Sequence, residues 1–318
     1  MLALILCRCT LLIYLVLLIP VAITVLYYIM QNGTDMSEEN RLEFFENFHF
    51  GGHRGSPAVT PENTITSFQK AKEDGCDVVE FDIHMSADGV PIVIHDDTTG
   101  RTGNSDLRVA TATWKQLEAV ELKQVGNSNG KIPTLAETID FCVANQIKML
   151  FDMKDDNAEL ITAVASEIKK RNLYKRVMVS SFNPLVPWRL KKIDRRIVTG
   201  LTLDRSYYSF SDDDRRAPFT RNMFSHWWNE VLDEVNILFS PLFVLPKFLG
   251  VDVIMFSYRL VCEETIRDAK ERGFSVVAWT VNDADYMRIL ARNNVPFLTD
   301  HSSKVDKNMF TAKSSSKL

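Results

Sequence analysis

Short runs of apolar, often β-branched residues alternate with longer amphipathic segments along most of the chain. The short runs have the length of strands, whereas the longer segments repeat their apolar residues every three or four positions, as one face of a helix does. This alternation is typical of βα units built around a parallel sheet. Eight strand cores are predicted, at residues 48–53, 78–83, 149–153, 177–182, 197–201, 251–256, 276–281 and 296–299.

Helical patterns lie between these strands, at residues 64–74, 135–145, 158–171 and 263–272 among others. A ninth extended run follows Asp88-Gly89 and is predicted as the return arm of a hairpin, residues 91–95. Eight parallel strands with about seven helices predict an α/β fold, the closed (β/α)8 or TIM barrel. An open doubly wound sheet is the alternative, but it favours a glycine-rich phosphate loop after its first strand, which this sequence lacks.

Two insertions interrupt the barrel pattern, at residues 84–130 and 202–250. Insertions at the carboxyl ends of barrel strands shape the mouth of the active site. The second insertion contains Phe224, Trp227 and Trp228, followed by an apolar stretch at residues 235–249. It is expected to form either a buried helix pair or an apolar lip that faces a membrane.

The amino-terminal segment is apolar from residue 9 to residue 30, and Arg8 is the only charged residue before Asp35. Its length predicts a transmembrane anchor within residues 1–34; a cleaved signal peptide, whose apolar part is shorter, is the alternative. The catalytic barrel is expected at residues 46–301 and a polar, disordered tail at residues 302–318. The positive-inside rule then places the barrel on the lumenal or extracellular side of an endomembrane or the plasma membrane.

Composition narrows the class of protein. The 318 residues are 46% apolar and 25% charged, which are ordinary values for a globular protein and exclude both wholesale disorder and a multi-span membrane architecture. The net charge is −4 and no dense basic block occurs, so a nucleic-acid partner is not expected. Of the five cysteines, Cys76, Cys142 and Cys262 are too scattered for a zinc motif, and buried thiols are expected instead of a disulfide scaffold.

Acidic side chains occur inside two of the predicted strands. Glu80 and Asp82 stand two positions apart in an otherwise apolar strand, so both project from one face of it. Asp152 and Lys154 repeat this spacing in the next barrel strand. Adjacent buried carboxylates need a cation or a shared proton, whereas a solvated strand face is the alternative explanation. Three carboxylates form an oxygen-only site suited to Mg²⁺ or Ca²⁺ and not to zinc.

Two histidines are predicted at the same end of the barrel. His53 ends the first strand and His95 ends the hairpin arm, so the pair can take up and return a proton near neutral pH. Arg54 and Lys154 are cations that can hold a phosphoryl oxygen, or simply pair with the carboxylates. Together these residues indicate metal-assisted attack on a phosphate ester.

The order and spacing of these motifs resemble the glycerophosphodiester phosphodiesterase (GDPD) family over nearly all of residues 48–301. The match rests on Gly52-His53-Arg54-Gly55, Pro61-Glu62-Asn63-Thr64, Val79-Glu80-Phe81-Asp82-Ile83, Asp88-Gly89-Val90-Pro91, Ile94-His95-Asp96, Lys131-Ile132-Pro133-Thr134-Leu135, Ser180-Ser181-Phe182, Trp279-Thr280-Val281-Asn282 and Leu298-Thr299-Asp300. The apolar amino terminus and the second insertion look most like the membrane-anchored glycerophosphodiester phosphodiesterase 1 type, whose members favour glycerophosphoinositol and related head groups.

The resemblance implies a role for each site residue. The family's metal ligands fall on Glu80, Asp82 and Asp152, and its acid and base on His53 and His95. Its phosphate-binding positions fall on Arg54 and Lys154, and Trp279 matches an aromatic that packs against the glycerol. Glu62 is expected to orient the site, and Asn63 is expected to cap the following helix. Many members have glutamate where Asp152 stands, which leaves the metal open between Mg²⁺, the expected cofactor, and Ca²⁺.

The implied activity is metal-dependent hydrolysis of glycerophosphodiesters to glycerol 3-phosphate and an alcohol. A lysophospholipase D that produces lysophosphatidic acid is the alternative among enzymes, because the apolar segments suit an acylated substrate. A phospholipase C specific for phosphatidylinositol uses a similar barrel but does not need these motifs. An inactive, membrane-tethered binding protein is the alternative from another class.

Overall fold

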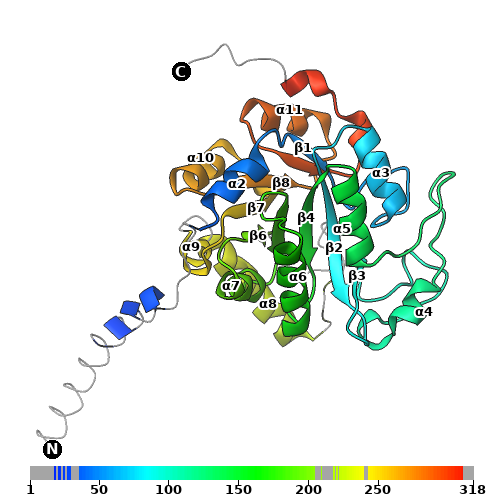
Figure 1. Cartoon of the computed structure of the whole chain (residues 1–318). Coiled ribbons are helices and arrows are strands. Elements are labelled where there is room, and N and C mark those ends of the chain that lie inside the picture. The colour runs from blue at the N-terminus through cyan, green and yellow to red at the C-terminus, as the bar shows by residue number, and fades with distance from the viewer. Residues whose placement is uncertain are drawn as a thin grey trace, which may run out of the picture.

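The structure, a computed structural model, describes residues 36–204, 222–239 and 243–310, with scattered positions in 18–29 and 209–220. In this part of the chain, eight parallel strands close into a barrel. The sheet is closed because β1 pairs with β2 on one side and with β9 on the other (Figure 1). The predicted TIM barrel is therefore confirmed. Its strands are β1 (Phe50–Gly52), β2 (Val78–Met85), β4 (Lys148–Met153), β5 (Val177–Ser181), β6 (Val198–Leu203), β7 (Val253–Ser257), β8 (Ser275–Trp279) and β9 (Phe297–Thr299).

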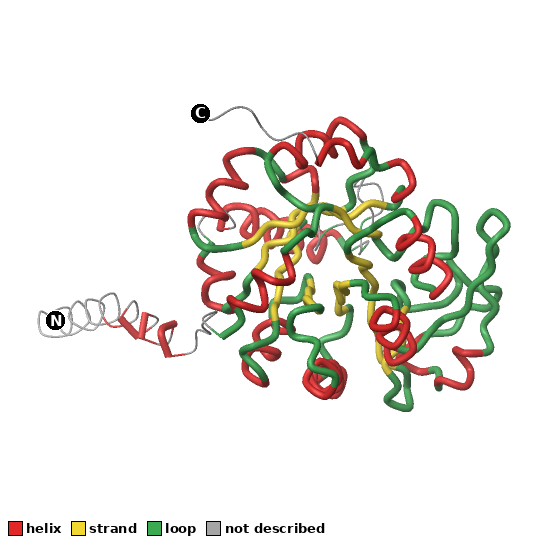
Figure 2. Tube along the Cα trace, turned by 45° about the horizontal axis from the view of Figure 1, so that its top comes forward, coloured by secondary structure: helices red, strands yellow, loops and turns green. Residues whose placement is uncertain are grey.

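Helices surround the strands on the outside (Figure 2). Their starts follow from local sequence: Thr134 and Glu137 form a capping box at α5, and Asp283 accepts hydrogen bonds from two backbone N–H groups at the start of α11. The helices are α3 (Ile65–Glu73), α4 (Trp114–Glu118), α5 (Leu135–Ala144), α6 (Ala158–Lys170), α7 (Leu185–Ile193), α8 (Met223–Phe239), α9 (Val244–Leu249), α10 (Glu263–Glu271) and α11 (Ala284–Arg292).

A helix that the sequence did not indicate, α2 (Glu38–Phe45), closes the amino-terminal end of the barrel. Lys148, the first residue of β4, donates from Nζ to the carbonyl oxygens of Glu43, Phe44 and Glu46 at 3.0, 2.8 and 2.6 Å. The Phe44 side chain is fully buried and packs with the apolar side chains inside the barrel. The barrel domain therefore begins before residue 46, where the sequence placed its start. The interior apolar residues are Val78, Leu150, Met178, Val198, Val253, Met255, Val277 and Leu298.

A buried ion pair fixes α2 to the wall of the barrel. Lys191 of α7 and Asp252, which precedes β7, are both fully buried, with Nζ and Oδ2 2.7 Å apart. Ser37, the residue before α2, joins them: its Oγ donates to Asp252 and accepts from Lys191. Buried charges are stable only when paired and hydrogen-bonded, as these are.

The first insertion is a separate small layer beside the barrel. It begins with β3 (Pro91–Val93), which pairs antiparallel with the end of β2 and confirms the predicted hairpin. A turn of 3₁₀ helix at Val109–Thr111 and the short α4 follow. They enclose an apolar cluster of their own, which includes Ile92, Val109 and Leu117. The insertion is thus anchored to the strand that carries Glu80 and Asp82.

Within its described residues, the second insertion is buried in one part and exposed in another. In α9, Pro246 and Leu249 are buried against the barrel. The start of α8 is exposed, since Met223 and Phe224 are 87% and 72% accessible and Trp227 and Trp228 are about half accessible.

At the chain ends, most of residues 1–34 lie outside the described residues. No helix in the described part of the chain has the length and apolar character needed to span a bilayer. The prediction of a disordered tail from residue 302 is wrong for its first part, because residues 302–310 contain two 3₁₀ turns. Apolar contacts hold this segment to the barrel: the Phe310 ring stacks on Phe50 of β1 and packs against Phe297 of β9. Residues 311–318 lie outside the described residues.

Candidate active site

A cavity of about 1130 Å³ opens at the carboxyl ends of the barrel strands. Parallel strands end at the same edge of a sheet, so side chains from distant parts of the chain meet there. All nine predicted site residues line this cavity: His53, Arg54, Glu62, Glu80, Asp82, His95, Asp152, Lys154 and Trp279. The structure therefore brings these nine residues together in one place.

Glu80, Asp82 and Asp152 form one buried acidic cluster. Asp82 of β2 lies directly beside Asp152 of β4 in the strand register. One carboxylate oxygen from each residue lies within 4.8 Å of the others. Oxygens that share an ion at about 2.0–2.6 Å can stand no more than about twice that distance apart, so the cluster fits a Mg²⁺ or Ca²⁺ ion. The cluster can hold a divalent cation.

The charges around this cluster are unequal. Burial and the neighbouring Asp82 raise the pKa of Glu80 to about 8. Burial also disfavours the Asp82 carboxylate, but Lys154, His95 and Arg54 outweigh it and hold the pKa of Asp82 well below its usual range. Three adjacent acids thus need positive charge, from a protonated side chain or from a bound cation.

Lys154 supplies part of that positive charge. Its Nζ lies 2.8 Å from Asp82 Oδ1 and 2.5 Å from Asp152 Oδ2. Ser180 of β5 donates to the other oxygen of Asp152 at 3.0 Å. Burial lowers the pKa of Lys154, but the two carboxylates outweigh it and raise that pKa, so the ammonium stays charged.

Asn63 is not the helix cap that the sequence indicated. Thr64 caps α3, because its hydroxyl accepts the hydrogen bond from Ser67 N. Asn63 instead has a φ of +56° and turns its side chain toward β2. Its Nδ2 donates to Asp82 Oδ2 at 2.7 Å, and its Oδ1 accepts from Asp82 N at 3.2 Å. The buried carboxylate of Asp82 needs this donor, which explains why Asn63 is drawn away from the helix end.

His53 is held by an acid from the opposite end of the chain. Its Nδ1 lies 2.8 Å from Asp300 Oδ1, and Asn282 donates to the other Asp300 oxygen at 2.7 Å. Because a carboxylate only accepts, Nδ1 carries the proton and Nε2 is left to exchange protons in the cavity. Burial and Arg54 lower the pKa of His53, but Glu80 and Asp300 outweigh them and raise it.

His95 is held in the same way by its neighbour in sequence. Its Nδ1 lies 2.6 Å from Asp96 Oδ1. Burial lowers the pKa of His95, despite the opposing influence of Asp82 and Asp96. The two histidines therefore differ in charge at a pH between their pKa values, which is the condition for one acid and one base in the same site.

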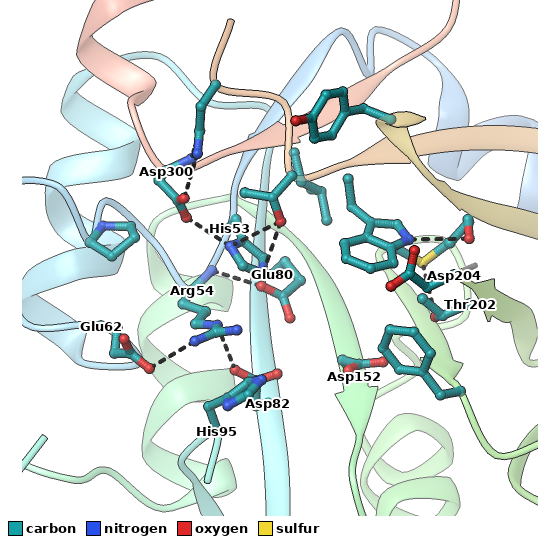
Figure 3. A pocket seen from close by; sticks show the side chains of 18 of the residues that line it. His53, Arg54, Glu62, Glu80, Asp82, His95, Asp152, Thr202, Asp204 and Asp300 are labelled. Carbon is teal, nitrogen blue, oxygen red and sulfur yellow. Dashed lines mark hydrogen bonds and ion pairs between the residues drawn. The ribbon is translucent and has the colours of Figure 1, made fainter. Parts of the chain in front are cut away.

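Arg54 lies between two carboxylates at the edge of the acidic cluster (Figure 3). Its Nη1 is 3.1 Å from Glu62 Oε1, and its backbone N donates to Glu80 at 2.7 Å. Its Nε is 3.3 Å from Asp82 Oδ2 yet makes no hydrogen bond to any described residue. The Arg54 side chain also lines the cavity, where a guanidinium is suited to a phosphate oxygen.

An aromatic wall completes the cavity. The Trp279 ring meets Phe182 edge-on, with the ring centroids 5.4 Å apart, and its Nε1 donates to the Met255 carbonyl at 3.2 Å. Lys154 lies 5.8 Å from the centroid of the Phe182 ring. The cavity is thus charged on the side of the acidic cluster and apolar at Trp279, which suits an ester with an anionic and a carbon-rich part.

Sequence reasoning missed the acids that orient the histidines. Asp96 and Asp300 stood inside the quoted motifs, directly after an extended run, and that position was a usable signal. Asn282 also stood in a motif, but nothing in its local pattern indicates that it supports Asp300, which lies 18 residues further along the chain.

Comparison with known proteins identifies the family. Residues 53–304 match the Glycerophosphoryl diester phosphodiesterase family. The chain is 28% identical over 245 residues to rat glycerophosphodiester phosphodiesterase 1, covering 73% of this chain and 71% of the relative, and 27% identical over 241 residues to the human protein, with the same coverage.

Solved structures share the fold. A putative glycerophosphoryl diester phosphodiesterase from Silicibacter pomeroyi superposes with a TM-score of 0.66 at 20% identity, over 85% of this chain and 97% of that one. A phosphodiesterase from Oleispira antarctica gives a TM-score of 0.62 at 20% identity, over 85% and 99% of the two chains. Since the family match covers most of the chain and all nine expected residues meet in one cavity, this protein belongs to the glycerophosphoryl diester phosphodiesterase family of enzymes.

Proposed function

We propose that this enzyme hydrolyses glycerophosphodiesters such as glycerophosphoinositol to glycerol 3-phosphate and an alcohol, and that it needs a divalent cation. The observation that carries the proposal is the pairing of two histidine–aspartate contacts with a buried three-carboxylate cluster in one cavity. The Oleispira antarctica phosphodiesterase was solved with its product sn-glycerol-3-phosphate, and the mammalian relatives are named glycerophosphodiester phosphodiesterase 1.

In the mechanism we infer, Glu80, Asp82 and Asp152 hold the cation, and Mg²⁺ is the expected ion. The bound cation supplies positive charge that stabilises the phosphoryl oxygens. The Arg54 guanidinium donates to a phosphate oxygen, and the ammonium of Lys154 adds a second positive charge.

The two histidines move the protons. One imidazole removes a proton from the nucleophile, either water or the 2-hydroxyl of the glycerol, whose oxygen then bonds to phosphorus. The bond from phosphorus to the alcohol oxygen breaks, and the second imidazole gives its proton to that oxygen. If the 2-hydroxyl attacks, water opens the cyclic phosphate in a second step. Trp279 bounds the side of the cavity where the glycerol carbons are expected.

The first experiment measures glycerol 3-phosphate released from glycerophosphoinositol by detergent-solubilised protein. Mg²⁺, Ca²⁺ and EDTA are compared, with the Glu80→Gln variant alongside. We expect turnover that needs a cation and falls by about 10²-fold or more without Glu80. Turnover that persists in EDTA would refute the cation requirement.

A lysophospholipase D is the second candidate function. The exposed start of α8, with Met223, Phe224 and Trp227, favours it, because an acyl chain needs an apolar surface near the enzyme. Turnover of lysophosphatidylcholine without turnover of glycerophosphoinositol would favour this candidate. Absence of turnover with both substrates would favour a membrane-tethered binding protein instead.

We also propose that residues 9–30 anchor the enzyme in a membrane, with the barrel on the lumenal or extracellular side of an endomembrane or the plasma membrane. The uncharged apolar run and the exposed tryptophans of α8, a residue type that gathers at bilayer surfaces, support this placement. In sealed microsomes, we expect the barrel to resist added protease until detergent is present. Digestion of the barrel in intact vesicles would show that the barrel lies on the cytoplasmic side.

A further inference from the structure

One arginine of the first insertion joins two carboxylates that border the active site. The Arg101 guanidinium donates to Asp96 from Nε at 2.6 Å and from Nη2 at 3.0 Å. It donates to Glu62 from Nη1 at 2.8 Å and from Nη2 at 2.7 Å. Both contacts are bidentate, which is the arrangement that fixes the orientation of a carboxylate most firmly.

Each of these carboxylates holds one residue of the proposed mechanism. Asp96 Oδ1 lies 2.6 Å from His95 Nδ1, and Glu62 Oε1 lies 3.1 Å from Arg54 Nη1. Arg101 itself does not line the cavity. We infer that Arg101 is a positioning residue, which sets the orientation of both His95 and Arg54 through Asp96 and Glu62. The inference rests on the roles proposed above for those two residues.

The backbone around Arg101 is fixed to the rest of the insertion. Lys123 Nζ donates to the carbonyl oxygens of Gly100 and Arg101 at 2.8 and 2.9 Å. A Cβ atom at Gly100 would stand 2.6 Å from Asp106 Oδ1, and one at Gly103 would stand 2.6 Å from a methyl of Val120. The turn is therefore closely packed on both sides of Arg101, although 48% of the arginine side chain is exposed.

The charges explain why the two carboxylates need an arginine between them. Burial disfavours both anions, yet hydrogen bonds from Arg101 help to hold the pKa of Glu62 and of Asp96 below their usual range. Without Arg101, the whole charge of Asp96 would act on His95, and that of Glu62 on Arg54. His95 would then hold its proton to higher pH, and Glu62 would bind Arg54 more tightly than it does in the parent.

The test uses the full chain in the glycerol 3-phosphate assay, with Arg101→Ala and Arg101→Lys. We expect kcat/KM to fall by about 10–100-fold in the alanine variant, because small displacements of reacting groups have effects of that order. The lysine variant should recover little of the lost activity, since one ammonium cannot make bidentate contacts with both carboxylates. Arg108→Ala, an exposed arginine of the same insertion, is the matched control and should keep the parent activity.

Chemical rescue distinguishes positioning from a merely structural role. The arginine site is half exposed, so millimolar guanidinium should restore part of the lost activity of Arg101→Ala and leave the parent and Arg108→Ala unchanged. The acid limb of the pH profile should move to higher pH in the alanine variant. In an Asp96→Asn background, removal of Arg101 should cost less activity than it does in the parent, because only the contact through Glu62 to Arg54 is left to lose.

Two results would overturn the inference: parent-like kcat/KM in Arg101→Ala, or a loss that guanidinium does not relieve and that adds fully to the loss in Asp96→Asn. Arg101→Gln offers the same test if the alanine variant does not fold by circular dichroism. His95→Ala and Arg54→Ala are run beside them. If His95→Ala and Arg54→Ala keep full activity, the proposed roles of His95 and Arg54 are wrong. If these two variants lose activity while Arg101→Ala keeps it, only the positioning role of Arg101 is refuted.

Discussion

The two histidines are oriented alike but titrate in different ranges. Each presents Nδ1 to an aspartate, Asp300 for His53 and Asp96 for His95. Glu80 and Asp300 outweigh burial at His53, whereas burial prevails at His95. From these opposite pKa shifts we propose that His95 is the base and His53 the acid near neutral pH, an assignment that the sequence left open.

We expect a bell-shaped dependence of kcat/KM on pH. Activity rises as His95 loses its proton, below the ordinary histidine range, and falls as His53 loses its proton, above that range. Asp300→Asn removes a carboxylate that raises the pKa of His53, so the alkaline limb should move to lower pH. A stopped assay with buffers of constant ionic strength measures both limbs. A flat profile for the parent enzyme, or an alkaline limb that stays in place in Asp300→Asn, would contradict the assignment.

At the scale of elements, the strands were easier to predict than the helix that closes the barrel. All eight predicted strand ranges overlap the observed ones, since buried parallel strands are short apolar runs. α2 was missed because its sequence, Glu38–Phe45, is largely polar and buries only Phe44. Pro184 and Pro187 lie at the start of α7, where a missing N–H is tolerated.

The buried Lys191–Asp252 pair makes the attachment of α2 testable. Asp252→Ala would leave the Lys191 ammonium buried without its partner, so we expect the free energy of unfolding to fall by about 3–5 kcal/mol. The matched variant is Lys191→Met with Asp252→Asn, which removes both charges and should recover much of the loss. Urea unfolding followed by circular dichroism gives both values. A loss of under about 1 kcal/mol in Asp252→Ala would show that the pair does not hold this end of the barrel.

At the scale of the whole molecule, the site depends on residues far apart in the chain. Spacing two within one strand indicated Glu80 and Asp82, because such residues share a face in any strand. No local pattern indicates that Asp300 meets His53, which lies 247 residues earlier, or that Arg101 meets Glu62 across 39 residues. Those pairings follow from closure of the barrel and from the fold of the first insertion, which a single sequence does not specify.

The acidic cluster should also couple the stability of the barrel to cations and pH. The pKa of Glu80 is raised to about 8, so its contribution to stability is fully present below its ordinary pKa and is lost as pH rises toward 8. In EDTA, we therefore expect the melting temperature to fall between about pH 5 and pH 8, and Mg²⁺ or Ca²⁺ to restore it. Glu80→Gln should lack this fall and melt higher than the parent in EDTA at pH 8, while being inactive. Differential scanning fluorimetry measures these shifts. Equal melting curves for parent and variant in EDTA at pH 8 would contradict the raised pKa of Glu80, and a parent melting curve that Mg²⁺ and Ca²⁺ leave unchanged would count against the cluster as a cation site.

The closing seam between β1 and β9 bears on how the protein is made. β1 pairs with β9, and Phe310 packs across both strands, so the first and last parts of the barrel to be synthesised hold each other in place. A nascent chain that has not yet reached residue 310 exposes the free edges of β1 and of its most recent strand, and such edges recruit other chains. It also lacks Asp300 and hence an oriented His53 until β9 has been completed. Premature termination before β9 would therefore yield a product that is both prone to aggregate and without activity, and catalysis begins only once the ring has closed.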